Sequence, residues 1–150
     1  IAVVSRSLQL DLTSALFTDS LVRTLVITSQ ASDPSARART AEVADVVVAG
    51  QSSVDLVEAV TELRARGLAR IHAEGGPHLL ADLAEADLVD EYLLTLAPHL
   101  VGGAARDESP LPRILAGHAL SASPRPLHLR HLLESDGTLF ASYLTHGQDR

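Results

Sequence analysis

The chain has 150 residues, a length suited to one domain with a substantial buried core. Its net charge of −7 argues against a surface that binds nucleic acid, and no apolar run reaches the roughly 18 residues that a membrane-spanning helix needs. The lack of cysteine excludes disulfides, thiolate metal sites and cysteine nucleophiles, in keeping with a cytoplasmic protein.

The first third of the chain is predicted to form three short apolar strands, at residues 2–4, 24–28 and 43–48. We expect an irregular connection at residues 8–17 and an exposed, flexible polar loop at residues 29–40. Small or polar residues end the first and third strands: Ser5, Arg6 and Ser7 after the first, and Ala49 and Gly50 after the third.

Residues 55–66 carry the clearest helix signal. Asp55 and Glu58 have the spacing of a capping box, in which each side chain bonds the other's backbone amide. An apolar stripe follows, and Gly67 provides the stop. A second helix is predicted at residues 77–85.

The stretch from Arg70 to Leu80 combines a predicted strand, a tight turn and the start of that second helix. Gly75 and Gly76 have no Cβ, so their backbone can let another molecule come close. Pro77 suits the first helical position. The free amides of the first turn and the helix dipole favour an anion such as a dinucleotide pyrophosphate. Close packing of strand against helix is the alternative interpretation of the two glycines.

Glu74 is predicted to end the strand around Ile71, in the middle of the sheet. Burying an unpaired carboxylate there would cost on the order of several kcal/mol. One interpretation is therefore a ligand contact at the carboxyl ends of the strands, where open α/β sheets bind their ligands. The other is a cap on the amides of a neighbouring loop.

The last third is predicted to contain a strand at residues 90–98, a long loop with one helical turn at 102–123, and a hairpin. The hairpin strands, 127–133 and 139–144, are joined by Asp136 and Gly137. Alternating strands and helices predict an α/β fold: a mostly parallel twisted sheet covered by helices, with the hairpin as an antiparallel edge.

The predicted hairpin contains two histidines three residues apart, His128 and His131. Residues three apart in a regular strand point to opposite faces, so these two are not expected to bind a metal jointly. No metal site is predicted, and no residue is assigned as a catalytic acid.

Several motifs together resemble the riboflavin-biosynthesis pyrimidine reductases, a C-terminal domain type of the dihydrofolate-reductase-like superfamily. The likeness runs from Ile1 to about Tyr143, and it is carried by Glu74-Gly75-Gly76-Pro77-His78-Leu79-Leu80, Ala86-Asp87-Leu88-Val89-Asp90-Glu91, Leu94-Thr95-Leu96-Ala97-Pro98 and Gly102-Gly103. The order and spacing of these motifs are far more specific than any one of them alone.

The resemblance implies an NADPH-dependent reductase that passes a hydride to the imine-like C1′ of a phosphoribosylamino-pyrimidine and yields the ribityl product. By the same resemblance Glu74 contacts the substrate. The residues expected to bind the cofactor are Ser5, Arg6, Ser7, Ala49, Gly50, Gly75, Gly76, His78 and Leu79. Arg6 and its flanking serines are similar to a pair that holds the 2′-phosphate, and the planar guanidinium suits that role. An exposed charge at a strand end is the alternative for Arg6.

The sequence departs from the family in one respect. Family domains begin with a further strand, helix and loop that carry much of the substrate pocket, and the chain starts at Ile1, without methionine, directly on a strand. We therefore expect residues 1–150 to be a partial domain from which an upstream part has been removed. Two alternatives stay open: a related reductase of a pterin, a folate or an unassigned substrate, and a nucleotide-binding module without catalysis.

A homodimer is also expected. The strand at residues 92–97 and the closing hairpin are more apolar than one buried sheet face requires. The family resemblance points to the same assembly.

Overall fold

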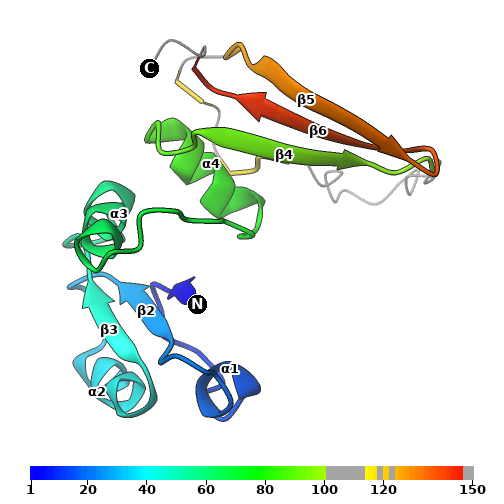
Figure 1. Ribbon diagram of the computed structural model, residues 1–150. Coiled ribbons are helices and arrows are strands. Elements are labelled where there is room, and N and C mark those ends of the chain that lie inside the picture. The colour runs from blue at the N-terminus through cyan, green and yellow to red at the C-terminus, as the bar shows by residue number, and fades with distance from the viewer. Residues whose placement is uncertain (101–113, 118–119, 122–123, 147–150) are drawn as a thin grey trace, which may run out of the picture. The chain divides into compact units, whose positions relative to one another are not determined.

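The computed structural model describes residues 1–100, 114–117, 120–121 and 124–146, and it divides into two compact units, Ile1–His72 and Ala73–Arg150 (Figure 1). Most of the loop predicted at residues 102–123, with its helical turn, lies outside the described residues. Within the described part of the chain, no helix is both long and apolar enough to cross a membrane.

The first unit is built on a parallel sheet of three strands in the order β1-β2-β3. These strands are β1 (Ala2–Val4), β2 (Leu25–Thr28) and β3 (Asp45–Val48). All three were predicted from their apolar runs. The central strand β2 is buried along its whole length, so its side chains form the middle of both apolar layers.

Helices lie against both faces of this sheet (Figure 1). On one face Ile27 and Val47 pack with Ala59 and Leu63 of α3 (Leu56–Ala65). On the other, Val26 packs in a cluster with Ala36 of α2 (Pro34–Val43). The alternation of Val26 and Ile27 to opposite sides follows from the two-residue period of a strand.

The polar loop predicted at residues 29–40 was wrong, because α2 occupies much of it. Asp33 is the N-cap, and its carboxylate accepts a hydrogen bond from the Ala36 amide at 2.8 Å. Pro34 then provides the first helical residue. A short helix, α1 (Ala15–Thr18), likewise lies at the end of the connection predicted to be irregular.

The capping box predicted for α3 forms only in part. The Asp55 carboxylate accepts from the amides of Val57 and Glu58, at 2.9 and 3.0 Å. Glu58 does not bond the Asp55 amide in return: its carboxylate accepts from the Gly50 amide at 2.7 Å, and the Asp55 amide donates to the Ala49 carbonyl at 3.2 Å. Glu58 therefore ties the helix to the end of β3.

The strand predicted around Ile71 does not form in the described structure, where residues 71–76 have no regular backbone pairing. Ile71 is 48% exposed, and Glu74 is exposed as well. The prediction was wrong because an apolar run becomes a strand only when neighbouring strands accept its backbone hydrogen bonds. The argument from burying the Glu74 charge falls with it.

The second unit contains α4 (Pro77–Glu85) and an antiparallel sheet in the order β4-β6-β5. Its strands are β4 (Glu91–Leu96), β5 (His128–Ser135) and β6 (Thr138–Leu144). The predicted hairpin is confirmed, with Asp136 and Gly137 at φ values of 50° and 78°, as a tight turn between twisted strands requires. The α/β class is confirmed too, although the described strands form two sheets instead of one. The strand predicted at residues 90–98 was expected in the mostly parallel part, but β4 pairs antiparallel with β6.

A β-bulge in β5 overturns the prediction for the two histidines. His128 pairs with Leu144 and His131 with Ser142, and the register shifts between Leu129 and His131. Leu144 and Ser142 are two apart on β6, so they share a face of the sheet, and their partners share it as well. His128 and His131 therefore lie on the same face. No group of three or more metal-ligating side chains occurs among the described residues.

Candidate cofactor and substrate site

The carboxyl edge of the parallel sheet in the first unit gathers the first set of predicted site residues. The Ser5 amide donates to the Ile27 carbonyl at 2.9 Å, which continues β1 past its last residue. The Ala49 amide donates to the Thr28 carbonyl at 2.8 Å, which continues β3 in the same way. Residues 5–7 and 49–50 therefore lie along one edge, where parallel sheets bind ligands.

The segment after β1 forms a turn that presents Arg6. The Ser5 hydroxyl oxygen accepts from the Leu8 amide at 3.1 Å, and Leu8 is buried with a φ of 53°. The Ser7 hydroxyl oxygen accepts from the Gln9 amide at 3.4 Å. Neither hydroxyl proton is donated to another of the described residues, so both hydroxyls can donate to a ligand. Arg6 is exposed and has no ion pair or hydrogen bond with the described residues, so its guanidinium can take an anion.

Gly50 shapes this edge through its backbone. Its φ is +85°, and a Cβ there would lie 2.2 Å from the Ser53 carbonyl oxygen, so no other residue fits without moving the backbone. The Gly50 amide is bonded to Glu58, and its carbonyl accepts from the Gln30 amide at 2.9 Å. The backbone at Gly50 can therefore come close to a ligand, whereas its amide already donates to the Glu58 carboxylate.

Thr28 and Ser29 end the central strand at the same edge, and neither was predicted as a site residue. Both are fully buried, and neither side-chain hydroxyl has a hydrogen-bond partner among the described residues. Their signal in the sequence was the hydroxyl pair that closes the apolar run of β2. The resemblance to the family assigned no role to either hydroxyl.

The second set of predicted residues lies in the second unit, at the start of α4. Gly76 is the N-cap, with φ −62° and ψ 171°, and no side chain caps the helix there. Pro77 is the first helical residue, as predicted. The amides of His78 and Leu79 belong to the first turn, which has no acceptor within the helix. Together with the helix dipole they form an arrangement suited to a phosphate.

Gly75 and Gly76 play different parts in this turn. A Cβ on Gly75 would lie 2.6 Å from Leu79 Cδ2, so the missing side chain lets Leu79 pack over the backbone. A Cβ on Gly76 would meet nothing within 4 Å. The space in front of the helix N-terminus is therefore open at Gly76 and filled at Gly75.

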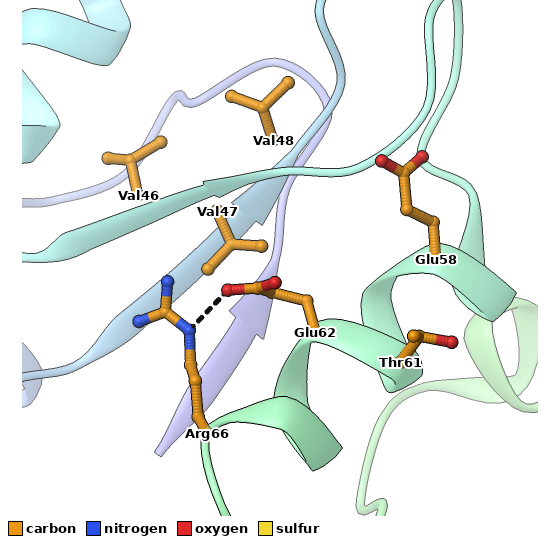
Figure 2. A pocket seen from close by; sticks show the side chains of 7 residues that line it. All are labelled: Val46, Val47, Val48, Glu58, Thr61, Glu62 and Arg66. Carbon is orange, nitrogen blue, oxygen red and sulfur yellow. Dashed lines mark hydrogen bonds and ion pairs between the residues drawn. The ribbon is translucent and has the colours of Figure 1, made fainter.

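Figure 2 shows a pocket of about 340 Å³ in the first unit, between β3 and α3. It is lined by Val46, Val47, Val48, Glu58, Thr61, Glu62 and Arg66. The Arg66 guanidinium closes one side through an ion pair with Glu62 at 2.8 Å. No residue predicted for the cofactor or substrate lines this pocket, and we do not assign it to the candidate site.

A larger pocket, of about 610 Å³, lies in the second unit between the end of α4, β4 and residues 124–127. Its walls are mostly apolar, with Tyr92, Asp87 and Arg125 among the polar lining groups. Burial raises the pKa of the Tyr92 hydroxyl, and the Asp87 carboxylate adds to the rise while Arg125 opposes it. This pocket also contains none of the predicted site residues.

Curated relatives of the chain share one name, 2,5-diamino-6-ribosylamino-4(3H)-pyrimidinone 5′-phosphate reductase. The protein from Archaeoglobus fulgidus is 32% identical over 101 residues, which cover 67% of this chain and 46% of that protein. The one from Methanothermobacter thermautotrophicus is 36% identical over 80 residues, covering 53% of this chain and 37% of the relative. The chain thus spans less than half the length of these relatives.

Solved structures resemble the chain as well. A pyrimidine reductase-like protein from Corynebacterium diphtheriae has a TM-score of 0.74 and 29% identity, and the match covers 95% of this chain and 59% of that one. RibD from Acinetobacter baumannii has a TM-score of 0.69 at 16% identity, over 95% of this chain and 36% of its own, and supports the fold alone.

The family model described as the RibD C-terminal domain matches residues 2–121. This match covers most of the chain and includes every residue predicted for the cofactor and substrate. The resemblance to pyrimidine reductases drawn from the sequence is confirmed, and the chain belongs to the RibD C-terminal domain family.

Proposed function

We propose that the protein containing this chain is an NADPH-dependent reductase of riboflavin biosynthesis. The family match over residues 2–121 carries this proposal, supported by relatives that are named as pyrimidinone phosphate reductases. The substrate would be a phosphoribosylamino-pyrimidine and the product its ribitylamino form. A biosynthetic role of this kind, in a chain without cysteine, fits a cytoplasmic location.

The chain's residues would bind and orient the two reactants. When bound, the nicotinamide supplies a hydride, which adds to C1′ of the substrate imine while a proton reaches the nitrogen. In the first unit, the exposed guanidinium of Arg6, which has no partner among the described residues, and the hydroxyls of Ser5 and Ser7 suit the 2′-phosphate. In the second unit, the turn at Gly75 and Gly76 and the first turn of α4, with His78 and Leu79, suit the pyrophosphate. Ala49 and Gly50 would border the adenine side.

Glu74 is assigned to the substrate. It directly precedes the glycine turn and is exposed, so its carboxylate can meet a ligand at the surface. Hydroxyl and N–H groups of the sugar and pyrimidine are donors that a carboxylate accepts.

The test of this assignment uses the complete protein with NADPH and the phosphoribosylamino-pyrimidine. Glu74→Gln should lower kcat/KM for the pyrimidine by roughly 10- to 100-fold, the loss of one charge-assisted hydrogen bond, and leave the NADPH dissociation constant unchanged. NADPH consumption measures the first quantity and fluorescence titration the second. Glu42→Gln, exposed on α2, is the matched control and should match the unmodified protein in both.

Three results would contradict parts of the proposal. Turnover of a pterin or folate in preference to the pyrimidine would identify a related reductase instead. NADPH binding without turnover of any of these substrates would identify a nucleotide-binding module. An equal loss of NADPH affinity in Glu74→Gln would place the carboxylate at the cofactor.

A further inference from the structure

Ala116 and Gly117 pack on the first turn of α4, within the second unit. The Ala116 amide donates a hydrogen bond to the Pro77 carbonyl at 3.1 Å. Gly117 follows with a φ of +117°, a conformation that side-chain-bearing residues rarely adopt. A segment distant in sequence is therefore fixed against the helix N-terminus at which we place the pyrophosphate.

The contact between Gly117 and His78 is the closest feature of this packing. A Cβ on Gly117 would lie 2.9 Å from His78 Nδ1 and 3.7 Å from Cε1, so the imidazole occupies the space of the missing side chain. Nε2, the other ring nitrogen, is not among the three nearest atoms and has no hydrogen-bond partner among the described residues. Any larger residue at position 117 would have to displace the ring.

His78 is the second residue of α4, and side chains at a helix start lean toward the N-terminus. An imidazole held there has Nδ1 against Gly117, which leaves Nε2 as the nitrogen that can donate to a ligand. A ring free to turn would lose rotamer entropy on binding, which a fixed ring does not.

We propose that Gly117 is a positioning residue for the phosphate site: its missing side chain seats the His78 imidazole at the first turn of α4, with Nε2 available to a phosphate of the cofactor. This inference rests on the proposed function, because it takes the ligand to be a dinucleotide phosphate. Gly117 itself does not touch the ligand.

The test is a double-mutant cycle in the complete protein, with NADPH as the probe and its dissociation constant as the readout. His78→Ala should weaken NADPH binding by about tenfold, the value of one hydrogen bond to a charged group, and Gly117→Ala should weaken it by a similar factor. The double variant should bind no more weakly than His78→Ala alone, because both changes remove the same contact. In the NMR spectrum, Gly117→Ala should also shift the His78 ring signals.

Gly67→Ala is the matched control for backbone strain. Gly67 also has a positive φ, +82°, but a Cβ there would meet nothing within 4 Å. This variant should lose some stability and keep its NADPH affinity. If Gly117→Ala does not fold, the double variant should regain part of the lost stability, because removing the imidazole removes the obstruction while the backbone strain at position 117 stays.

Unchanged NADPH affinity in Gly117→Ala, strictly additive losses in the cycle, or a double variant as unfolded as Gly117→Ala would each overturn this inference and leave the proposed function intact. An unmodified protein that does not bind NADPH would overturn the proposed function, and this inference with it.

Discussion

Arg6 is the residue on which the choice of cofactor should depend. It is exposed, follows β1 directly, and has no partner among the described residues. Its charge is therefore not neutralised by an ion pair with any described residue. A planar guanidinium beside two hydroxyls suits a phosphate monoester. NADPH carries such a group at the 2′ position, and NADH does not.

We expect Arg6→Ala to remove most of the preference for NADPH over NADH, a change of roughly 1.5–3 kcal/mol in the difference of binding free energies. The measurement is the pair of dissociation constants in the complete protein. Arg64→Ala, which removes an exposed arginine from α3, is the control and should keep the preference. A preference that survives in Arg6→Ala would move the 2′-phosphate to another residue.

Tyr92 is expected to make stability depend on pH at the alkaline end. Burial raises the pKa of its hydroxyl above the ordinary value of 10.0, so the folded state holds the proton more tightly than the unfolded state. The free energy of unfolding should therefore be unaffected below about pH 10 and fall as the pH rises above it. Urea unfolding at increasing pH measures this, and Tyr92→Phe should lessen the fall. Tyr143→Phe keeps Tyr92, so its free energy of unfolding should fall with pH as in the unmodified protein. An identical fall in the unmodified protein, Tyr92→Phe and Tyr143→Phe would contradict this prediction.

At the scale of elements, periodic patterns were the reliable guide. The strands of the first unit, α3, α4 and the hairpin all carry regular apolar spacing or strong caps, and all were predicted from the sequence. Helix α2 was missed because Pro34–Val43 is polar on nearly every side and buries only Ala36 and Thr40. Its cap at Asp33 followed by Pro34 was the available signal.

Features that depend on distant partners were beyond the sequence. Whether the run at Ile71 becomes a strand depends on neighbours that supply hydrogen bonds, and the bulge in β5 depends on its register with β6. The same holds at the candidate site. The glycine turn and Pro77 were readable locally, whereas the Glu58 bond to Gly50 and the seat of His78 against Gly117 join residues that no local pattern connects.

For the molecule as a whole, we propose a homodimer formed through the antiparallel sheet. Leu93 pairs with Ser142, and Thr95 pairs with Phe140. Cross-strand partners share a face, and so do residues two apart on one strand, so Leu93 and Phe140 lie on the same face of the sheet. Leu133 pairs with Phe140 and shares that face. Leu93 and Leu133 are 66% exposed and Phe140 43%. The charge of Glu91 on this face is matched by Arg130 at 3.5 Å, so the face can meet its own copy without a net charge.

Light scattering of the complete protein at micromolar concentration should give the mass of a dimer. Leu93→Asp should shift it toward the monomer, because two buried carboxylates would face an apolar surface. Leu21→Asp, at a fully exposed leucine in the first unit, is the control and should leave the dimer unchanged. A monomeric unmodified protein, or equal dissociation in both variants, would contradict the proposed interface.

The bulge in β5 has a further consequence for how copies of the chain avoid uncontrolled association. β5 is an outer strand of its sheet, and all eight of its residues are exposed. A long regular outer strand is a template onto which a stray strand can add, the first step of aggregation. The extra residue in the bulge, Arg130, breaks the even spacing of the amides and carbonyls along this strand. A strand of another molecule cannot keep its register across the bulge. This edge of the sheet therefore resists the addition of further strands, although several of its side chains are leucine.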